Sequence, residues 1–311
     1  MPNNLTTDAG LSPTMMTYYV KEFLSRPKEL LIFEQGLQKR THPKNNGKTV
    51  NFTRYTVPSQ ITSALSEGVN PTSRSLNATT VAATLAEYGD SFALSRFLSL
   101  TDIDQENKEK ISIAGQVMAE SRDVRVRNEL ATGATVVRPS TATSDITTTS
   151  AMILTSTEVR KVTTKLRKNK ALPIAGKFPW LAKIGLDAGY DLKGDTLWNQ
   201  AKTYSDTKDL YNGEIGELHG ARFLETTQPT IFTGVGASSI DLTYSYFHGA
   251  EAAGVMDLEG DQMQVYIVPH TKVDSGNVAG RLGFISWAGT EAYKTLNANW
   301  ILGLKHAFTA V

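Results

Sequence analysis

The stretch NNGKTVNFTRYTV, residues 45–57, alternates apolar and polar side chains. Val50 and Phe52 fall on one face of an extended chain and small polar residues fall on the other, which is the pattern of a half-buried β-strand. A second stretch, NATTVAATLAEYG (residues 77–89), alternates in the same way. The apolar residues on its common face are Val81, Ala83 and Leu85. The sequence therefore predicts two strands that pair as a hairpin.

The connection between these strands is long and has no period of its own. Residues 58–76, PSQITSALSEGVNPTSRSL, separate the two alternating stretches by 19 residues. Two strands of about ten residues are each roughly 30 Å long, and a two-stranded ribbon alone is only marginally stable in water. A long connection within a compact domain usually has a function. We expect a protruding hairpin that buries its faces against another molecule. The alternative is that a strand from later in the same chain covers it.

The segment LTDIDQENKEKISIAGQVMAESRDVRVRNELATG, residues 100–133, predicts one long helix. Asp102 and Gln105 can form a capping box, and Gly133 is a natural stop. A helix of about 28 residues is some 40 Å long, which exceeds the usual helix of a globular protein. The apolar positions that recur at helical spacing form a narrow stripe: Ile111, Ala114, Val117/Met118, Ser121 and Val124/Arg125. This pattern predicts a helix that lies across a sheet like a spine.

The rest of the chain predicts an α+β protein. Residues 15–40 favour two short amphipathic helices broken at Pro27, with these positions buried: Phe23, Leu30, Leu31, Phe33 and Leu37. Residues 156–171 predict a helix, and 178–290 alternate short apolar runs with glycine and proline turns. The last thirty residues predict two further strands around a short linker.

Composition excludes several classes of protein. The net charge of +1 gives no overall attraction to nucleic acid or to an anionic membrane. The sequence has no cysteine, which excludes disulfides, thiolate metal sites and a cysteine nucleophile. No stretch approaches about 20 apolar residues, and the N-terminus lacks the order of a signal peptide. We expect a soluble protein that is made in the cytoplasm and has no membrane partner.

The segment YNGEIGELHG, residues 211–220, is the candidate for chemistry. Glu214, Glu217 and His219 carry the groups that bind metals or transfer protons, but their spacing matches neither the helical pair of a zinc protease nor a calcium loop. The glycines between them argue against a helix and favour a strand–turn–strand. No other constellation supports catalysis, so we expect neither an enzyme nor a cofactor or metal.

The predicted helix 156–171 is strongly basic. Its cations are Arg160, Lys161, Lys165, Arg167, Lys168 and Lys170. Such a run is usually a solvated helix face, but in a nearly neutral protein it also suits an acidic partner or the phosphates of a nucleic acid.

The ordered series of segments resembles the major capsid proteins of tailed bacteriophages, in the N-four-like group. The segments that carry the resemblance are MMTYYVKEFLSRPKELLIFEQGLQKRTHPKNNGKTVNFTRY, SEGVNP, AEYGDSFALSRFLSLTDID, YNGEIGELHGARFLETT and AGVMDLEG. KNNGK before the hairpin and YNGEIG before a returning strand are its most specific pieces. The resemblance covers most of residues 15–310 and departs from the family pattern at 172–195.

The resemblance implies the Hong Kong 97 capsid fold, an α+β architecture. The expected parts are an N-terminal arm (1–46), an extended hairpin or E-loop (47–90), a peripheral domain with the spine helix (91–154), an axial domain (155–285) and a C-terminal return to the peripheral sheet (286–311). The hairpin would lap over a neighbouring subunit. The expected intersubunit contacts are Val50, Phe52, Tyr55, Val81 and Leu85.

The resemblance also implies the function and the partners. Subunits would close as hexamers and pentamers into an icosahedral shell around double-stranded DNA, assembled in the host cytoplasm and found in the virion. Partners would be a portal protein, a separate scaffolding protein and, where one is present, a decoration protein. Residues 58–90 contain no lysine, so a covalent crosslink from the hairpin tip is not expected. The alternative is the shell of a cellular nanocompartment with the same fold, which would hold a cargo enzyme.

Overall fold

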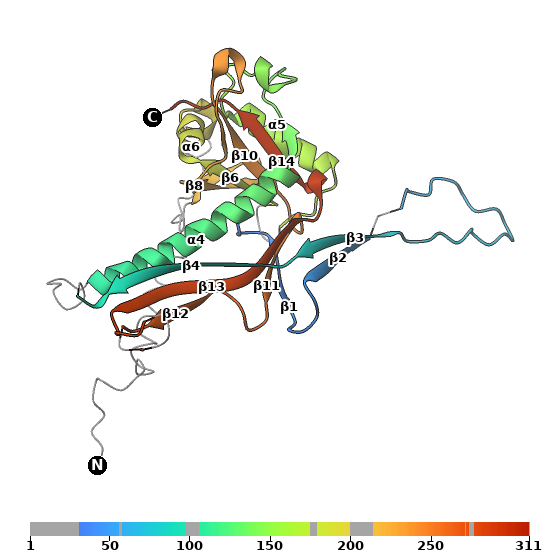
Figure 1. The fold of residues 1–311 in the computed structure, drawn as a ribbon. Coiled ribbons are helices and arrows are strands. Elements are labelled where there is room, and N and C mark those ends of the chain that lie inside the picture. The colour runs from blue at the N-terminus through green and yellow to red at the C-terminus, as the bar shows by residue number, and fades with distance from the viewer. Residues whose placement is uncertain are drawn as a thin grey trace.

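The computed structural model describes residues 31–55, 58–97, 106–174, 179–199, 214–270, 272–273 and 277–310. Two sheets, one long helix between them and a projecting hairpin make up this part of the chain (Figure 1). None of the helices in the described ranges is long and apolar enough to cross a lipid bilayer.

The first sheet, which we call the long sheet, is built around its longest strand. Its strands are β4 (Ala86–Ser95), β13 (Leu282–Thr295), β12 (Gln264–Val268), β11 (Ala253–Leu258) and β1 (Gln38–His42). β13 pairs with β4 along one edge and with β12 and then β11 along the other, all antiparallel. β1 adds in parallel to β11. Strands from both ends of the sequence therefore meet in this sheet.

The second sheet, which we call the compact sheet, is mixed and is covered by helices. Its order is β5 (Thr135–Val137), β14 (Ile301–His306), β10 (Leu242–His248), β6 (Trp180–Gly185), β8 (Ala221–Thr226) and β7 (Glu214–Leu218), with β9 (Ile231–Phe232) beside β10. The helices α5 (Ser156–Lys168) and α6 (Leu186–Lys193) pack on it. Short 3₁₀ helices lie at Asp145–Thr147, Ala237–Ser239 and Ala298–Trp300. β10 is buried along its whole length because it lies near the middle of the sheet.

The long helix is confirmed as α4 (Glu106–Gly133), 28 residues in length. Its first turns pack on the long sheet through Ile111, Ala114 and Met118, as the apolar stripe predicts. Further along, the buried stripe continues through Asp123, Val126 and Leu130 rather than through the predicted Ser121 and Val124/Arg125. The last turns of the helix contact both sheets. The predicted capping residues, Asp102 and Gln105, lie outside the described residues.

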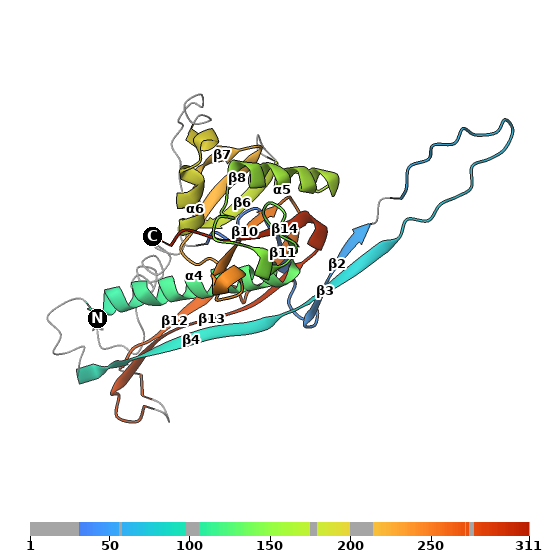
Figure 2. The same cartoon turned by 90° about the horizontal axis from the view of Figure 1, so that it is seen from above.

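The hairpin is also confirmed. β2 (Thr49–Tyr55) and β3 (Ala78–Thr84) pair antiparallel, with Phe52 opposite Val81. Figure 2 shows that these strands continue the line of β4 beyond the end of the long sheet and that residues 58–77 extend outward as a loop. We call residues 58–77 the hairpin loop.

The predicted helix over residues 28–40 is wrong where the structure describes it. Residues 33–36 form a turn and β1 follows at once. Gly36 has a φ of +74°, a left-handed conformation that ends a helix, and the parallel pairing with β11 supplies the hydrogen bonds of the next residues. Phe33 and Leu37 are buried as predicted. The first predicted helix, Phe23 and Leu30 lie outside the described residues.

Strand pairing crosses the predicted domain boundaries. The resemblance implies one domain over residues 155–285, but β11 and β12 pair with β13 in the long sheet, beside α4. It returns 286–311 to that same sheet, but β14 crosses to the compact sheet and pairs with β10. A strand's own residues indicate that it is a strand and say little about its partner, so the two crossings are not visible in the sequence. The names of the domains stay predictions.

The base of the hairpin depends on a glycine in the long sheet. A Cβ placed on Gly254 of β11 would lie 2.6 Å from Cζ of Phe52. We expect Gly254→Ala to displace the ring and to lower the free energy of unfolding by about 1–3 kcal/mol, because overpacking forces neighbours to move. The matched control is Gly303→Ala on β14, whose Cβ would meet its nearest atoms at 3.4 Å, an ordinary contact. Equal losses in urea unfolding of the two variants would contradict this prediction.

Candidate functional site

The base of the hairpin is packed against its own chain. Phe52 and Leu85 are 3% and 8% exposed, in a cluster with Met256 of β11 and Ala292 of β13. Val50 and Val81 pack against the same cluster. Only Tyr55 of the five predicted intersubunit residues is highly exposed, at 68%. In this conformation a later part of the same chain covers Phe52 and Leu85, and the contact of these residues with another subunit stays a prediction.

The hairpin loop carries several exposed apolar side chains. Its large apolar residues Ile61, Leu65, Val69 and Leu76 are all 64–69% exposed. The guanidinium of Arg74 connects the two sides of the loop, because it donates to the carbonyl and the hydroxyl oxygen of Ser59, both at 2.8 Å. Exposed apolar side chains on one projecting element indicate a binding surface. The alternating pattern of the strands could not predict these residues, because they lie in a loop. The presence of four large apolar residues in one loop could have indicated a binding surface.

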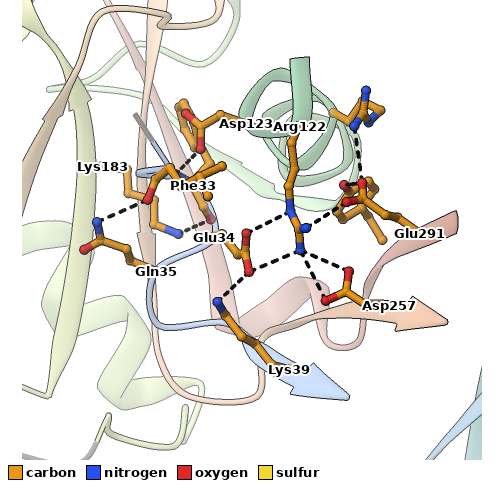
Figure 3. Close-up of polar contacts among 12 residues, drawn as sticks. Phe33, Glu34, Gln35, Lys39, Arg122, Asp123, Lys183, Asp257 and Glu291 are labelled. Carbon is orange, nitrogen blue, oxygen red and sulfur yellow. Dashed lines mark hydrogen bonds and ion pairs between the residues drawn. The ribbon is translucent and has the colours of Figure 1, made fainter. Parts of the chain in front are cut away.

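An ionic cluster joins the N-terminal segment, α4 and the long sheet (Figure 3). Its centre is Arg122 of α4, which contacts Glu34 at 3.0 Å, Glu291 at 2.8 Å and Asp257 at 3.1 Å. The carboxylate of Glu291 is fully buried and also contacts Arg125 at 3.2 Å and the hydroxyl of Tyr293. Lys39 contacts Glu34 at 2.5 Å from the exposed side. One arginine thus connects three segments that are far apart in the sequence.

The charges of the cluster depend on one another. Burial alone would lower the pKa of Arg122, but Glu291, Glu34 and Asp257 raise it above its ordinary value. Burial raises the pKa of Glu291, and Arg122 opposes that rise. A buried ion pair contributes little over an apolar pair, but breaking one by removing a partner is strongly destabilising. The cluster therefore fixes how the N-terminal segment sits on the helix.

A second polar clamp holds the same segment at Phe33. The backbone N–H of Phe33 donates to Asp123 of α4 at 2.7 Å, and its carbonyl accepts from Lys183 of β6 at 2.6 Å. Burial raises the pKa of Asp123 to about 6, although the hydrogen bond from the Phe33 N–H and the charge of Lys183 both act to lower it. Burial lowers the pKa of Lys183 to about 7, although the charges of Asp123 and Glu34 act to raise it. The Phe33 backbone therefore bridges Lys183 of the compact sheet and Asp123 of the long helix.

The compact sheet buries two histidines. His306 bonds Ser245 Oγ at 2.8 Å and the Ala307 carbonyl at 2.7 Å. Burial lowers the pKa of His306 to about 4, against the effects of the Ala307 carbonyl and Asp191. Burial also lowers the pKa of His248 well below the ordinary value, and Lys183 adds to that effect.

We expect His306 to make the protein less stable in acid. The ordinary pKa of histidine is about 6.5, so between pH 6.5 and 4 the unfolded chain binds a proton that the folded chain does not. The free energy of unfolding therefore decreases as the pH is lowered through this window, by up to about 3 kcal/mol from His306. The drop in melting temperature from pH 7 to 4.5 should be smaller for His306→Asn than for the wild type. His219→Asn is the control. Partial burial and Arg160 lower the pKa of His219 as well, but the residue is largely exposed, so this variant should keep most of the wild-type drop. An unchanged drop in His306→Asn would contradict this prediction.

Residues 214–220 of the segment YNGEIGELHG form a strand and a tight turn. β7 pairs with β8, and His219 and Gly220 form the turn between them with φ values of 52° and 80°, as the strand–turn–strand prediction requires. His219 Nε2 forms a hydrogen bond with the hydroxyl of Ser156 at 2.9 Å. Ser156 is fully buried, so a substrate could not reach this hydroxyl. In the described part of the chain, no three acidic, histidine or cysteine side chains gather as a metal site would need.

The basic helix is confirmed, but its cations do not share one surface. α5 begins after the N-cap Thr155 and buries Val159, Val162 and Leu166. Four of the six predicted cations line one shallow hollow: Arg160, Lys161, Lys165 and Lys168. Lys161 is partly occupied, since it donates to the carbonyls of Arg138 and Ser140. Lys170 lines a different groove, beside the hairpin.

The sequence matches no protein-family model and no curated protein. The structure is similar to the capsid of Ralstonia phage GP4, with a TM-score of 0.73 and 13% identity over 91% of this chain and 92% of that one. It is similar to the capsid structure of cyanophage P-SCSP1u, with a TM-score of 0.66 and 14% identity over 90% and 89%. It is also similar to the acidic stable capsid structure of Helicobacter pylori bacteriophage KHP30, with a TM-score of 0.65 and 13% identity over 89% of each chain. At these identities the likeness shows a shared fold.

Proposed function

We propose that this chain, which has the Hong Kong 97 fold of tailed-phage capsids, is itself a phage major capsid protein. The observation that carries the proposal is the match to capsids of several phages over about nine tenths of both chains. A match of that extent leaves only about a tenth of either chain outside the shared fold. The role is structural, with no catalytic step assigned to any residue.

In this proposal the subunits associate as hexamers and pentamers and close an icosahedral shell. The projecting hairpin loop supports this, because its apolar side chains have no cover within the described part of the chain. Repetition in a closed shell multiplies contacts that are individually weak. The ionic cluster and the Phe33 clamp would keep the N-terminal segment, the long helix and the two sheets in one orientation in every copy.

The shell would enclose double-stranded DNA in the virion, after assembly in the host cytoplasm with a portal, a scaffolding protein and, where present, a decoration protein. The hollow lined by Arg160, Lys161, Lys165 and Lys168 supports contact with an anionic partner. Packaged DNA is the partner that fits best, because the cations recur every turn along α5 and contacts of this kind are independent of base sequence.

Nuclease protection tests the contents of the shell. Purified particles are treated with nuclease, and any protected nucleic acid is extracted and sized. We expect long double-stranded DNA in particles from infected cells. Shells from those cells that hold a protein cargo and no nucleic acid would contradict the proposal and favour the nanocompartment.

A further inference from the structure

A groove of about 660 Å³ lies between the hairpin, β1 and the connections that follow α5, β10 and β13. Its apolar part includes Phe52, Val81, Leu296 and Trp300. Residues 64–70 of the hairpin loop do not line it, and Figure 1 shows the end of that loop well away from the body of the subunit. Pro58, Ser59 and Gln60, at the start of the hairpin loop, line one side of the groove, and the far end of that loop does not enter it. The remaining space is large enough for a few residues of a partner.

The groove is positively charged. Arg40, Arg54 and Lys170 line it together with one acid, Glu251. Arg54 stacks over the ring of Trp300 at 5.4 Å, and Arg40 stacks over Phe52 at 5.0 Å. Both arginines are therefore held at the apolar floor, where a bound carboxylate would be partly shielded from water.

Lys170 occupies a position that suits glycine better. The backbone of Ala171 donates to the Leu166 carbonyl at 3.1 Å, and that of Lys170 to the Arg167 carbonyl at 3.0 Å. This is the bond pattern of a Schellman motif, whose left-handed residue is usually glycine. Lys170 adopts it with a φ of 51°, at a cost on the order of 1 kcal/mol. In this conformation Lys170 lines the groove.

The end of the hairpin loop has the complementary chemistry. The Val69 N–H donates to the Ser66 carbonyl at 3.2 Å, and Gly68 has a φ of +76°, so residues 66–69 form a tight turn with Glu67 at its corner. Glu67 is the one acid of the hairpin loop. Exposed Leu65 and Val69 flank it. One carboxylate between two apolar side chains fits a cationic groove with an apolar floor.

We propose that the turn at residues 66–69 of one copy docks in the hairpin groove of the next copy, with Glu67 facing Arg40, Arg54 and Lys170. The contact is head-to-tail, because the turn and the groove lie on different parts of one chain. Such a contact repeats around a ring when the rotation closes. The inference rests on the proposed function, since it names the surface through which neighbouring subunits of the shell would join.

Engineered cysteines test the contact in the purified, assembled protein. The natural chain has no cysteine, so every disulfide must join introduced residues. We expect the pair Glu67→Cys and Leu172→Cys, whose second site lines the groove, to form a ladder of linked subunits under oxidising conditions. The control pair Glu67→Cys and Leu197→Cys has a similarly exposed second site outside the groove, and should give dimers at most. Similar products from both pairs would overturn the proposal.

Charge variants separate the contact from simple stability. Lys170→Gly should raise the melting temperature, because it relieves the left-handed strain, and yet lower the yield of assembled particles several-fold. Glu67→Lys should also lower that yield, and adding Arg54→Glu should restore part of it. If Glu67→Lys and Lys170→Gly both assemble as well as the wild type, the docking contact is wrong. Wild-type shells in the same experiment would leave the proposed function standing.

Discussion

Arg122→Met is expected to lower the free energy of unfolding by about 3–5 kcal/mol, because it breaks a buried ionic cluster by removing the partner at its centre. The guanidinium contacts Glu34, Asp257 and Glu291. Removing it leaves the fully buried carboxylate of Glu291 with Arg125 as its remaining cation. The same substitution should loosen the N-terminal segment, because Glu34 loses its partner on α4. Urea unfolding of the purified subunit measures the loss.

Two further variants identify the cause of that loss. Arg127, on the same helix, donates to the backbone carbonyls of Gln228 and Pro229 at 3.1 and 3.2 Å. Arg127→Met should cost about 1 kcal/mol, the value of ordinary hydrogen bonds. Adding Glu291→Gln to Arg122→Met should recover part of the lost stability, because it removes a fully buried charge that has lost one of its two arginine partners. Equal losses from Arg122→Met and Arg127→Met, with no recovery in the double variant, would contradict the role given to the ionic cluster.

Phe52→Ala is expected to lower the free energy of unfolding by about 3–5 kcal/mol, because it empties a packed site at the base of the hairpin. The ring lies against Gly254 and belongs to the cluster with Met256 and Ala292. Amide exchange in β2 and β3 should rise together with the loss in urea unfolding, because the strands lose their main contact with the long sheet.

The control is Thr53→Ala, on the solvent face of the same strand, which should change stability by less than about 0.5 kcal/mol. A Phe52→Ala variant as stable as Thr53→Ala would mean that the hairpin base is not packed on the subunit. The intersubunit contact expected from the sequence at Phe52 would then regain support.

The hairpin and the long helix could be predicted because each has a clear period over many residues. Val50 and Phe52 alternate with polar residues, and Ile111, Ala114 and Met118 recur at helical spacing, so local pattern alone indicates the element. The turn at His219 and Gly220 was predictable for a similar reason, since the glycines of that segment exclude a helix. The fold resemblance read from the ordered segments is confirmed by the structural matches.

The partners of these elements could not be predicted. The stripe of α4 continues through Asp123, a charged residue that no apolar pattern selects, because its partner is the Phe33 backbone 90 residues earlier. The burial of Phe52 depends on Gly254 and Met256, which lie some 200 residues later in the chain. The alternating pattern therefore indicated which face of the hairpin is apolar but not which surface covers that face. The docking groove could not be predicted for the same reason, because its residues are far apart in the sequence.

Electron microscopy of the purified protein, with light scattering on the same sample and with scaffolding protein supplied if the subunit alone stays monomeric, tests whether this chain builds a shell. We predict closed icosahedral particles, or rings of five and six subunits that convert to them. A monodisperse species of about 34 kDa at high concentration, unchanged by the scaffold and absent from purified virions, would contradict the proposed function.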